Sequence, residues 1–286
     1  VYRMVKHIIL DTDIGGDPDD AFALLLGLNS PEIQIDLIVT SDEHLGHRAE
    51  FAKEILQQLG INIPVVRGSD LGNDKLCVVD DLVQSPKFIK QAEQNYLSRI
   101  KDVVQKNSKT YYVCISPQTN LARFLEHFPE LTKKLEVLIM GGAINYRQEG
   151  VAEHNIRYDV KSAISVLNSN VKKRYVLHDI TFKPAIKIDA QHEIYKRIKN
   201  SKSLVRELIL GNLKNFFTKL YPHCFMHDPL TLSYLIKPKF LKFEKKHITM
   251  NSDGIMRFSK NGKLLNISTY ADYKGFMNFL NSRLPF

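Results

Sequence analysis

Five aspartates lie within ten residues near the start of the sequence. The segment Asp11-Thr-Asp-Ile-Gly-Gly-Asp-Pro-Asp-Asp20 directly follows the apolar run Ile8-Ile9-Leu10. Carboxylates this close repel one another unless a cation or protons neutralise them. A ligand set made only of oxygens favours a hard cation such as Ca²⁺ or Mg²⁺ over zinc. The segment therefore predicts a divalent-metal site at the end of a buried strand.

Parts of this cluster also fit turn chemistry or a different class of enzyme. Aspartate is common in turns and at helix N-caps, where it accepts backbone N–H bonds, and Asp17-Pro18 fits turn chemistry. An Asp-x-Asp pair after a first strand also resembles the Mg²⁺-dependent phosphatases of the haloacid dehalogenase type. The Asp19-Asp20-Ala21 that follows is not part of that phosphatase pattern. The choice between these classes depends on motifs further along the chain.

Three later segments carry polar residues at positions where α/β proteins build sites. They are Ser116-Pro-Gln-Thr-Asn-Leu-Ala122, Met140-Gly-Gly-Ala143 with the following Glu153-His-Asn155, and Cys224-Phe-Met-His-Asp-Pro-Leu-Thr231. Helix capping is an alternative for two of them: by Thr119 or Asn120 in the first, and by Asp228 with proline at N1 in the last. Each segment alone is therefore a modest signal.

Charge and composition narrow the class of partner. The 286 residues carry a net charge of +9, and 44% are hydrophobic, which is enough for a sizeable core. The basic residues are scattered in pairs such as Lys133-Lys134 and Lys245-Lys246, without an RNA-binding or zinc-finger signature. We therefore expect a small-molecule partner and no nucleic acid.

The chain has no apolar run of the roughly 18–20 residues that a membrane span needs. Its first residues, 1–6, lack the apolar core of a signal peptide. The three cysteines (Cys77, Cys114 and Cys224) lie far apart and have no metal-ligand spacing. We expect a cytoplasmic protein with reduced thiols and no membrane partner.

Short apolar, β-rich segments alternate with helical patterns along most of the chain. Strands are predicted at His7–Leu10, Ile35–Thr40, Ile63–Val66, Thr110–Ile115, Leu135–Met140 and Arg174–His178. Helices are predicted at Asp20–Leu28, Gly46–Gln58, Ile89–Gln105, Asn120–His127, Val160–Ser169, Ser201–Leu220 and Tyr273–Leu284. This alternation predicts an α/β fold, a mostly parallel sheet flanked by helices. Three further predicted strands (His247–Met250, Ile255–Ser259 and Leu264–Ser268) indicate a small C-terminal antiparallel meander. We expect residues 1–286 to form a single domain.

The four motifs, taken in order, resemble the inosine-uridine preferring nucleoside hydrolases. The resemblance spans essentially the whole chain, including Val176-Leu-His-Asp-Ile-Thr181. It implies a nucleoside hydrolase-like fold, a bound Ca²⁺, and hydrolysis of the N-glycosidic bond of ribonucleosides. It argues against the phosphatase, which has no use for the segment His227-Asp-Pro229. Members are commonly homo-oligomers, so a dimer or tetramer is expected.

The resemblance also implies site residues. The metal ligands would be Asp13, Asp20, Asp228 and the backbone carbonyl of Thr119. Asp13 would also be the general base, and His227 the candidate acid for the leaving base. The substrate contacts would come from Asp19, Glu153 and Asn155, with Asp42 as the nearest equivalent of a family asparagine.

The chain departs from the family pattern around the sugar. The first loop is two residues longer and adds Asp17, and the segment 143–152 lacks the usual Gly-Asn-x-x-Pro while Arg147 and Arg157 lie nearby. These changes leave two alternatives open: a hydrolase of related ribosides such as nucleotides or nicotinamide riboside, and a non-catalytic riboside-binding protein of the same fold.

The chain has no tryptophan, so indole stacking on a base is excluded. Tyr146, Tyr158, Tyr221 and Phe225 are the candidates for aromatic contacts, although such residues are often core or rim residues. His178 and His223 have the same ambiguity.

Overall fold

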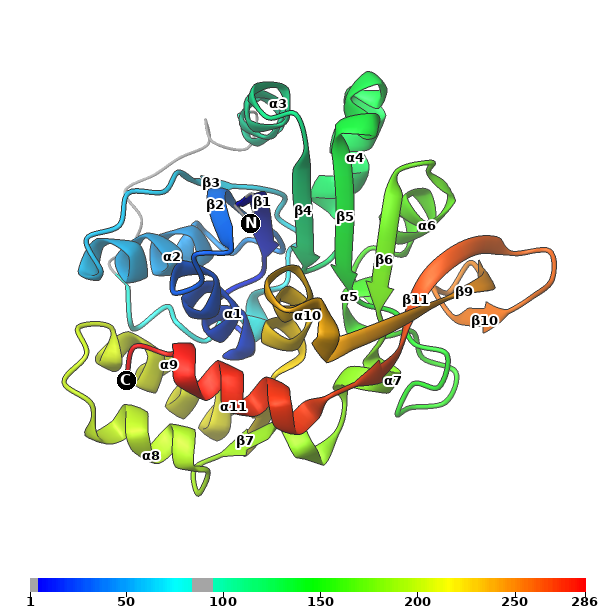
Figure 1. Ribbon diagram of the computed structural model, residues 1–286. Helices are drawn as coiled ribbons and strands as arrows, with labels where there is room; N and C mark the ends of the chain where they lie inside the picture. The colour runs from blue at the N-terminus through cyan, green and yellow to red at the C-terminus, as the bar shows by residue number, and fades with distance from the viewer. Residues whose placement is uncertain (1–4, 84–94) are drawn as a thin grey trace.

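A nine-stranded sheet forms the centre of the molecule (Figure 1). The computed structural model describes residues 5–83 and 95–286. The strand order is β10-β9-β11-β6-β5-β4-β1-β2-β3. The strands are β1 (Lys6–Thr12), β2 (Ile33–Thr40), β3 (Val65–Arg67), β4 (Thr110–Ile115), β5 (Leu135–Met140), β6 (Lys172–Val176), β9 (Leu241–Met250), β10 (Met256–Phe258) and β11 (Lys263–Ala271). The six strands from β1 to β6 run parallel, which confirms the predicted sheet.

Helices cover both faces of this sheet (Figure 1). In β1, Ile8 and Leu10 join one core cluster and Ile9 joins the other, because successive side chains point to opposite faces. The first face carries α1 (Asp19–Leu28), α2 (His47–Gln58), α9 (Arg206–Lys219), α10 (His227–Ile236) and α11 (Tyr273–Arg283). The second face carries α3 (Tyr96–Lys106), α4 (Thr119–His127) and α6 (Val160–Asn168). Burial on both faces explains why the strands are continuous apolar runs in the sequence.

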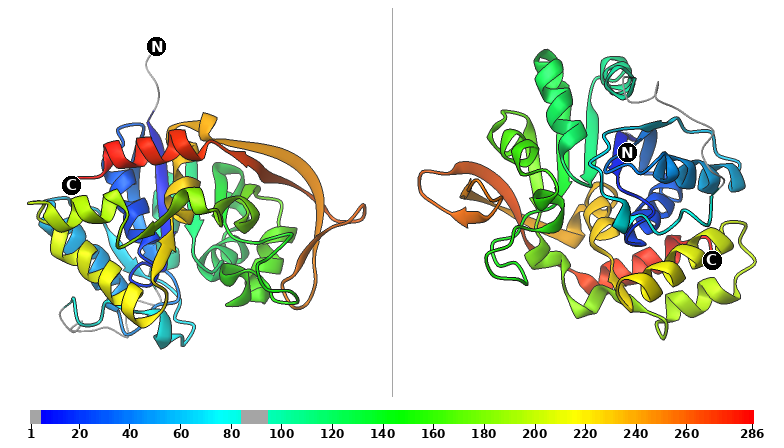
Figure 2. Two further views of the ribbon diagram at one scale, coloured as in Figure 1. Left: turned by 90° about the horizontal axis from the view of Figure 1, so that it is seen from below. Right: turned by 180° about the vertical axis from the view of Figure 1, so that it is seen from behind.

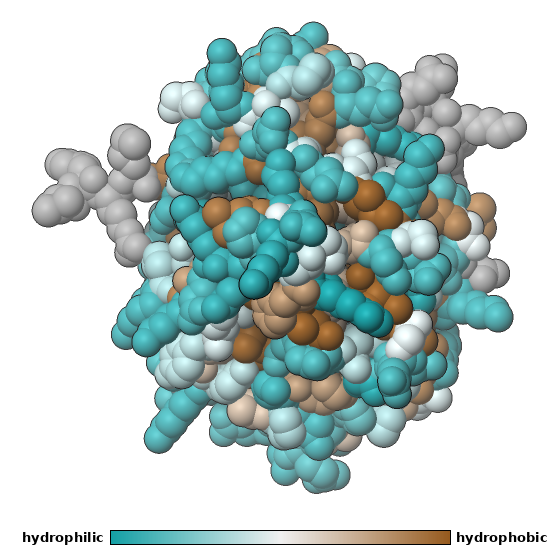
Figure 3. All heavy atoms as spheres, turned by 90° about the vertical axis from the view of Figure 1, so that its right-hand side faces the viewer, coloured by the Kyte–Doolittle hydropathy of each residue, from teal (hydrophilic) through white to brown (hydrophobic). Residues whose placement is uncertain are grey.

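The predicted C-terminal meander is present. Strand β9 pairs antiparallel with β10 and with β11, and β11 then joins β6 in parallel. The meander extends outward from the body (Figure 2), and its exposed side chains include Phe258, Leu264 and Tyr270. The face on this side is mostly hydrophilic, with hydrophobic side chains in small separate patches (Figure 3).

Several predicted boundaries were wrong. Strand β6 ends at Val176, and His178 begins the short helix α7 (His178–Thr181). The helix predicted at Ser201–Leu220 begins only at Arg206, so Leu204, which an amphipathic helix over the whole range would have turned inward, precedes the helix and is 73% exposed. Of the helix predicted at Ile89–Gln105, residues 89–94 lie outside the described residues.

Several short elements were not predicted from the sequence. They include α5 (His154–Arg157), α8 (Glu193–Asn200), and a two-stranded antiparallel sheet of β7 (Lys187–Asp189) and β8 (His223–Phe225). Each has eight residues or fewer, and periodicity is a weak signal over such lengths. Among the described helices, none is both long and apolar enough to cross a bilayer.

Candidate active site

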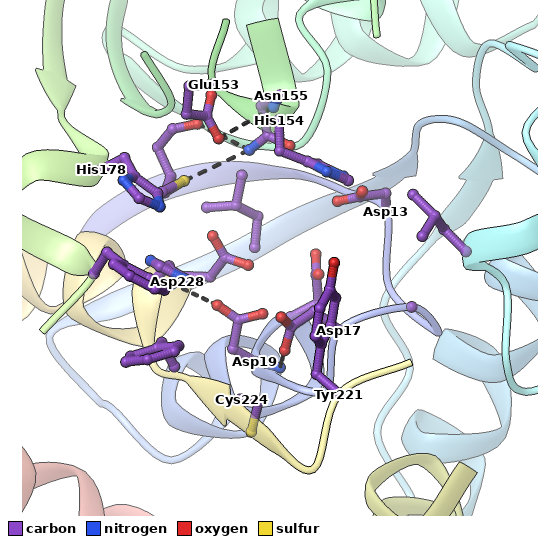
Figure 4. Close-up of a pocket in the computed structure, with 18 of the residues that line it drawn as sticks. Asp13, Asp17, Asp19, Glu153, His154, Asn155, His178, Tyr221, Cys224 and Asp228 are labelled. Carbon is purple, nitrogen blue, oxygen red and sulfur yellow. Dashed lines mark hydrogen bonds between the residues drawn. The ribbon is translucent and has the colours of Figure 1, made fainter. Parts of the chain in front are cut away.

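A pocket of about 250 Å³ opens at the carboxyl edge of the parallel strands. This is where open α/β sheets bind ligands, because the loops after the parallel strands converge there. The residues that line it include Asp13, Asp17, Asp19, Asp20, Asp228, Glu153, His154, Asn155, Tyr146, Arg147, Arg157, Tyr158, His178, Phe182, Tyr221, His223, Phe225 and His227. Segments far apart in the sequence therefore contribute to one site (Figure 4).

Three buried carboxylates form a cluster in this pocket. Asp19, Asp20 and Asp228 each offer one oxygen, and these atoms lie within 4.8 Å of one another. The main-chain N–H of Asp228 donates to Asp19 Oδ2 at 3.1 Å, and the Thr12 hydroxyl donates to Asp20 Oδ1. Asp19 and Asp20 form the first turn of α1, so the positive end of that helix faces their charges.

Helix capping does not account for these aspartates. The residue before α1 is Pro18, and no side chain caps that helix end. Helix α10 begins at His227, which puts Asp228 inside its first turn rather than at the N-cap. None of the three therefore caps its own helix, and the one bond to a helix N-terminus is the bond from the Asp228 N–H to Asp19, which joins α10 to α1.

The carboxylates of the cluster hold protons more tightly than exposed ones do. Burial raises the pKa of Asp20 well above its usual range, and the charges of Asp13 and Asp19 add to this effect. Burial also raises the pKa of Asp228, with a further rise from the charge of Asp19. A cation bound between these groups would remove the mutual repulsion.

The donor set suits a hard divalent cation. The group contains only carboxylates, all of them buried, and no imidazole or thiolate belongs to it. Hard oxygen ligands of this kind favour Ca²⁺ or Mg²⁺. Of the predicted ligands, the structure brings Asp20 and Asp228 together and adds Asp19, for which the sequence predicted a sugar contact.

Asp13 and Asp17 line the same pocket beside this cluster (Figure 4). Both are half-buried. Burial raises the pKa of Asp13, while the guanidinium of Arg48 opposes the rise. Burial raises the pKa of Asp17 to about 7. The longer first loop therefore adds a fourth carboxylate from the same segment to the pocket.

Asp11 has a different role from the other four aspartates. Its side chain is fully buried and accepts hydrogen bonds from Tyr112 Oη at 2.7 Å, Ser116 Oγ at 3.1 Å and Asn120 Nδ2 at 3.0 Å. The amide of Asn120 also donates to the carbonyl of Thr40 at 3.0 Å. Asp11 therefore ties β1 to the loop after β4 and does not line the pocket.

Thr119 and Asn120 do not cap α4, since no side chain caps that helix at Gln118. The Thr119 hydroxyl donates to Asp159 Oδ2 at 2.6 Å, and Thr119 is not among the pocket-lining residues. The proposed calcium contact from its main-chain carbonyl stays a prediction.

Asp42 is placed outside the pocket lining. Its backbone adopts a positive φ of 47°, and its Oδ2 accepts a hydrogen bond from Asn73 Nδ2 at 3.0 Å. The same oxygen lies 3.7 Å from Arg48 Nη2, and both side chains are fully buried. The pairing with Arg48 draws Asp42 away from the sugar contact that the sequence predicted.

Glu153 and Asn155 lie on a different side of the pocket from Asp17 and Asp19 (Figure 4). The Glu153 carboxylate caps α5 and accepts main-chain N–H groups from Gly142 at 2.9 Å, Asn155 at 3.1 Å and Ile156 at 3.3 Å. Asn155 Nδ2 donates to the Met140 carbonyl at 3.1 Å. These bonds hold α5 against the end of β5, where the two glycines after Met140 both have positive φ.

Aromatic and imidazole rings form another wall. His178 stacks on Phe182 with ring centroids 4.8 Å apart and lies 5.7 Å from His227. Tyr146 contacts His178 at 4.7 Å, and Phe225 contacts Phe182 at 4.4 Å. The flat, largely apolar surface of these rings suits a planar heterocycle. The aromatic candidates Tyr146, Tyr158, Tyr221 and Phe225 all line the pocket.

Three histidines of the pocket are neutral at pH 7. Burial lowers the pKa of His227 well below its usual range, and His178 and Arg147 lower it further. Burial also lowers the pKa of His178 to about 4 and that of His154 to about 3. His227 Nδ1 lies 2.7 Å from the Thr181 hydroxyl, which leaves Nε2 as its remaining polar atom. A neutral His227 can donate a hydrogen bond from Nε2 when Thr181 donates to Nδ1.

Three contributors were missed from the sequence. Two of them lie beside motifs that the sequence analysis had already identified. Phe182 directly follows Thr181, and His154 lies between Glu153 and Asn155. Arg48 gave a different signal: it lies four residues before the buried Ala52, on the buried side of α2. A cation on a buried helix face needs acceptors, and that is the signal that could have identified it.

A buried carboxylate cluster facing an aromatic wall fits a glycosidase, because carboxylates stabilise the positive charge that a sugar develops as its bond to the leaving group breaks. The family model described as "Inosine-uridine preferring nucleoside hydrolase" matches residues 8–277. The chain belongs to this family, whose members cleave N-glycosyl bonds.

Relatives of known structure or curated function cover the whole length. The pyrimidine-specific ribonucleoside hydrolase RihA of Salmonella schwarzengrund is 27% identical, over 99% of both chains. The plant nucleoside hydrolase PpNRh1 has a TM-score of 0.81 at 22% identity, covering 98% of this chain and 99% of that one. The purine-preferring ribonucleoside hydrolase of Gardnerella vaginalis has a TM-score of 0.79 at 21% identity, covering 98% of both. These similarities confirm the predicted fold.

Proposed function

We propose that this protein hydrolyses the N-glycosidic bond of ribonucleosides in a calcium-dependent reaction that releases ribose and the free base. The observation that carries the proposal is the pocket itself, in which Asp19, Asp20 and Asp228 lie within 4.8 Å of one another and share a cavity with a wall of rings. A ribonucleoside has the matching parts, a diol and a planar base. Membership of the family supports the same reaction class.

Calcium would be held by Asp19, Asp20 and Asp228, and when bound it supplies a positive charge for sugar hydroxyls and lowers the pKa of a water molecule. Asp13, which lines the pocket beside them, accepts a proton from the attacking water. The water oxygen bonds to C1′ as the C1′–N bond breaks. The bonding pair of that bond goes to the base nitrogen.

The developing positive charge on the ribose is stabilised by the surrounding carboxylates. On the other side, the base lies against the ring of Phe225, and His227 Nε2 donates a hydrogen bond to it. Because His227 is neutral, it stabilises the departing base as a hydrogen-bond donor, and the proton that completes the free base comes from solvent.

A reducing-sugar assay tests the proposal. Purified protein with added Ca²⁺ is given a panel of purine and pyrimidine ribonucleosides, and the panel is repeated with excess chelator. We expect ribose release that the chelator abolishes and that Ca²⁺ restores. Release that persists in chelator would refute calcium dependence. Bound calcium and bound nucleoside without any release would instead identify a riboside-binding protein.

A further inference from the structure

The third side of the pocket is basic. It consists of α5 and the preceding segment 144–152, and the side chains that it directs to the pocket include Arg147, His154 and Arg157. His154 is neutral, since burial and then Arg157 lower its pKa to about 3. The two guanidinium groups are therefore the positive charges on this side.

Arg147 is held at the pocket by rings rather than by acids. Its guanidinium carbon lies 5.3 Å from the ring centroid of Phe182, 5.7 Å from Tyr146 and 5.9 Å from Tyr221. These three rings come from different segments, and the guanidinium lies against all of them through cation–π contacts. Within the described residues, Arg147 donates no hydrogen bond, and its N–H groups are available to a ligand.

Arg157 is similar. Its Nη1 donates to the Ala152 carbonyl at 3.3 Å, and its guanidinium carbon lies 5.8 Å from the Tyr158 ring. In the described part of the chain, no carboxylate lies within ion-pair distance of Arg147 or Arg157. The nearby Glu153 is not a partner, because its oxygens accept three main-chain N–H groups.

The shape of a riboside places its third substituent on this side. A ribose ring carries the diol at C2′ and C3′, the base at C1′ and the 5′ carbon at C4′, so these groups point in three directions. The cation held by Asp19, Asp20 and Asp228 takes the diol, and the wall around Phe225 and His227 takes the base, while Phe182 carries the guanidinium of Arg147. Figure 4 shows Glu153, His154 and Asn155 across the pocket from Asp17 and Asp19. The 5′ carbon then points toward α5.

We propose that Arg147 and Arg157 bind a phosphate on the 5′ carbon, so that ribonucleoside 5′-monophosphates are the preferred substrates. This inference rests on the proposed function, because it assigns a substrate class to the same reaction. Guanidinium groups suit this role, since their fork of N–H donors matches phosphate oxygens. Water adds across the C1′–N bond as before, the phosphate ester stays intact, and the products are ribose 5-phosphate and the free base.

Matched substrate pairs test the inference. Values of kcat/KM are measured with Ca²⁺ for uridine against its 5′-monophosphate and for inosine against its 5′-monophosphate. We expect the ratio of phosphorylated to unphosphorylated substrate to exceed one, by on the order of tenfold for each charged contact. Arg147→Gln and Arg157→Gln should each lower that ratio about tenfold. Arg257→Gln is the matched control, because Arg257 is exposed on β10 and does not line the pocket.

Binding of the products gives a second readout that needs no turnover. Calorimetry should show ribose 5-phosphate binding more tightly than ribose to the calcium-loaded protein, with the difference reduced in Arg147→Gln. Nucleosides cleaved better than their phosphates, or a ratio that neither variant changes, would overturn the inference and leave the proposed function intact. Absence of cleavage of any substrate would overturn the proposed function, and the calorimetric comparison would still decide whether the phosphate subsite exists.

Discussion

The main-chain N–H of Asp228 donates to Asp19 Oδ2 at 3.1 Å, across a sequence separation of 209 residues. This bond joins the first turn of α10 to the first turn of α1. Two helix N-termini thus bring their acidic residues to one point, where each helix dipole favours negative charge. The arrangement brings mutually repelling carboxylates together. Whether they are ionised therefore depends on whether a cation or protons bind between them.

Replacing Asp228 by asparagine should therefore have opposite effects on the two forms of the protein. Without metal, the variant loses one of several repelling carboxylates, and its free energy of unfolding at pH 8 should rise by about 1 kcal/mol. With calcium it loses a ligand, and the calcium affinity should fall at least tenfold. Calorimetric titration with Ca²⁺ and thermal melts with and without chelator measure both effects.

Asp253→Asn is the matched control for Asp228→Asn, because Asp253 is exposed in the turn between β9 and β10. Asp253→Asn should change neither the free energy of unfolding of the metal-free protein nor the calcium affinity. Equal calcium affinity in wild type and Asp228→Asn would remove Asp228 from the metal site.

The pH dependence of stability should differ between the metal-free and the calcium-loaded protein. Burial raises the folded-state pKa of Asp17 from 3.8 to about 7, so the folded protein binds its proton more tightly than the unfolded chain does. The stability from this group is present below about pH 4 and is lost as the pH rises through 7. Metal-free protein should therefore melt at a lower temperature at pH 8 than at pH 5.

Calcium should restore the melting temperature most at high pH, because binding replaces protons on the carboxylates. Melts over pH 5 to 8, each with chelator and with saturating Ca²⁺, test this. A metal-free protein that grows more stable toward pH 8 would contradict the assignment of raised pKa values to these aspartates.

Local sequence was enough to predict the sheet and the acidic loop. Buried parallel strands are short apolar runs, and β4 and β5 have the predicted bounds, Thr110–Ile115 and Leu135–Met140. The Asp-Asp pair after Pro18 enters the pocket as expected. These features depend on residues that are neighbours along the chain.

What could not be predicted depends on contacts across the fold. The sequence does not show that Asp11 turns to Tyr112 while Asp13 lines the pocket, since both flank Thr12 in the same segment. Nor does it show that Asp42 pairs with Arg48, because the direction of the Asp42 side chain follows from a positive φ and a buried cation. Short elements such as α5 and β8 are likewise determined by tertiary packing.

Asp13→Asn should abolish turnover while the fold is preserved. Asp13 lines the pocket beside the three-carboxylate cluster but is not one of its members, so loss of its basicity removes a proton acceptor without removing one of those three ligands. We expect kcat to fall by about 10²–10⁴-fold. Circular dichroism and calcium titration serve as controls for folding and metal binding. A well-folded variant with full activity would refute the role of Asp13 as base.

Thr181→Val should reduce kcat through His227. The Thr181 hydroxyl lies 2.7 Å from His227 Nδ1 and so controls which ring nitrogen carries the proton. Valine has nearly the same shape but cannot form this hydrogen bond, so kcat should fall about tenfold while KM changes little. The pH profile should show no ionisation of His227 near 6.5 in either protein, since burial lowers its pKa well below that value. An unchanged kcat in Thr181→Val would separate Thr181 from catalysis.

Arg48 should be a positioning residue for the acidic loop. Its side chain is fully buried, its Nη1 donates to the carbonyls of Asp13 and Ile14, and its Nε donates to the Asp42 carbonyl at 2.7 Å. Arg48→Met would leave the Asp42 carboxylate buried without its cation, which costs about 3–5 kcal/mol of stability. The loop that carries Asp13 would also lose its anchor, so we expect kcat and calcium affinity to fall together.

The double variant Arg48→Met with Asp42→Asn separates these two effects. Removing the uncompensated charge should recover most of the lost stability, because a buried ion pair can be replaced by neutral groups at little cost, whereas breaking one partner is expensive. It cannot restore the hydrogen bonds to the carbonyls of Asp13 and Ile14. Thermal melts should therefore approach wild type while kcat stays low. Recovery of both stability and kcat would show that Arg48 serves only to neutralise Asp42, and recovery of neither would show that the two residues are not a functional pair.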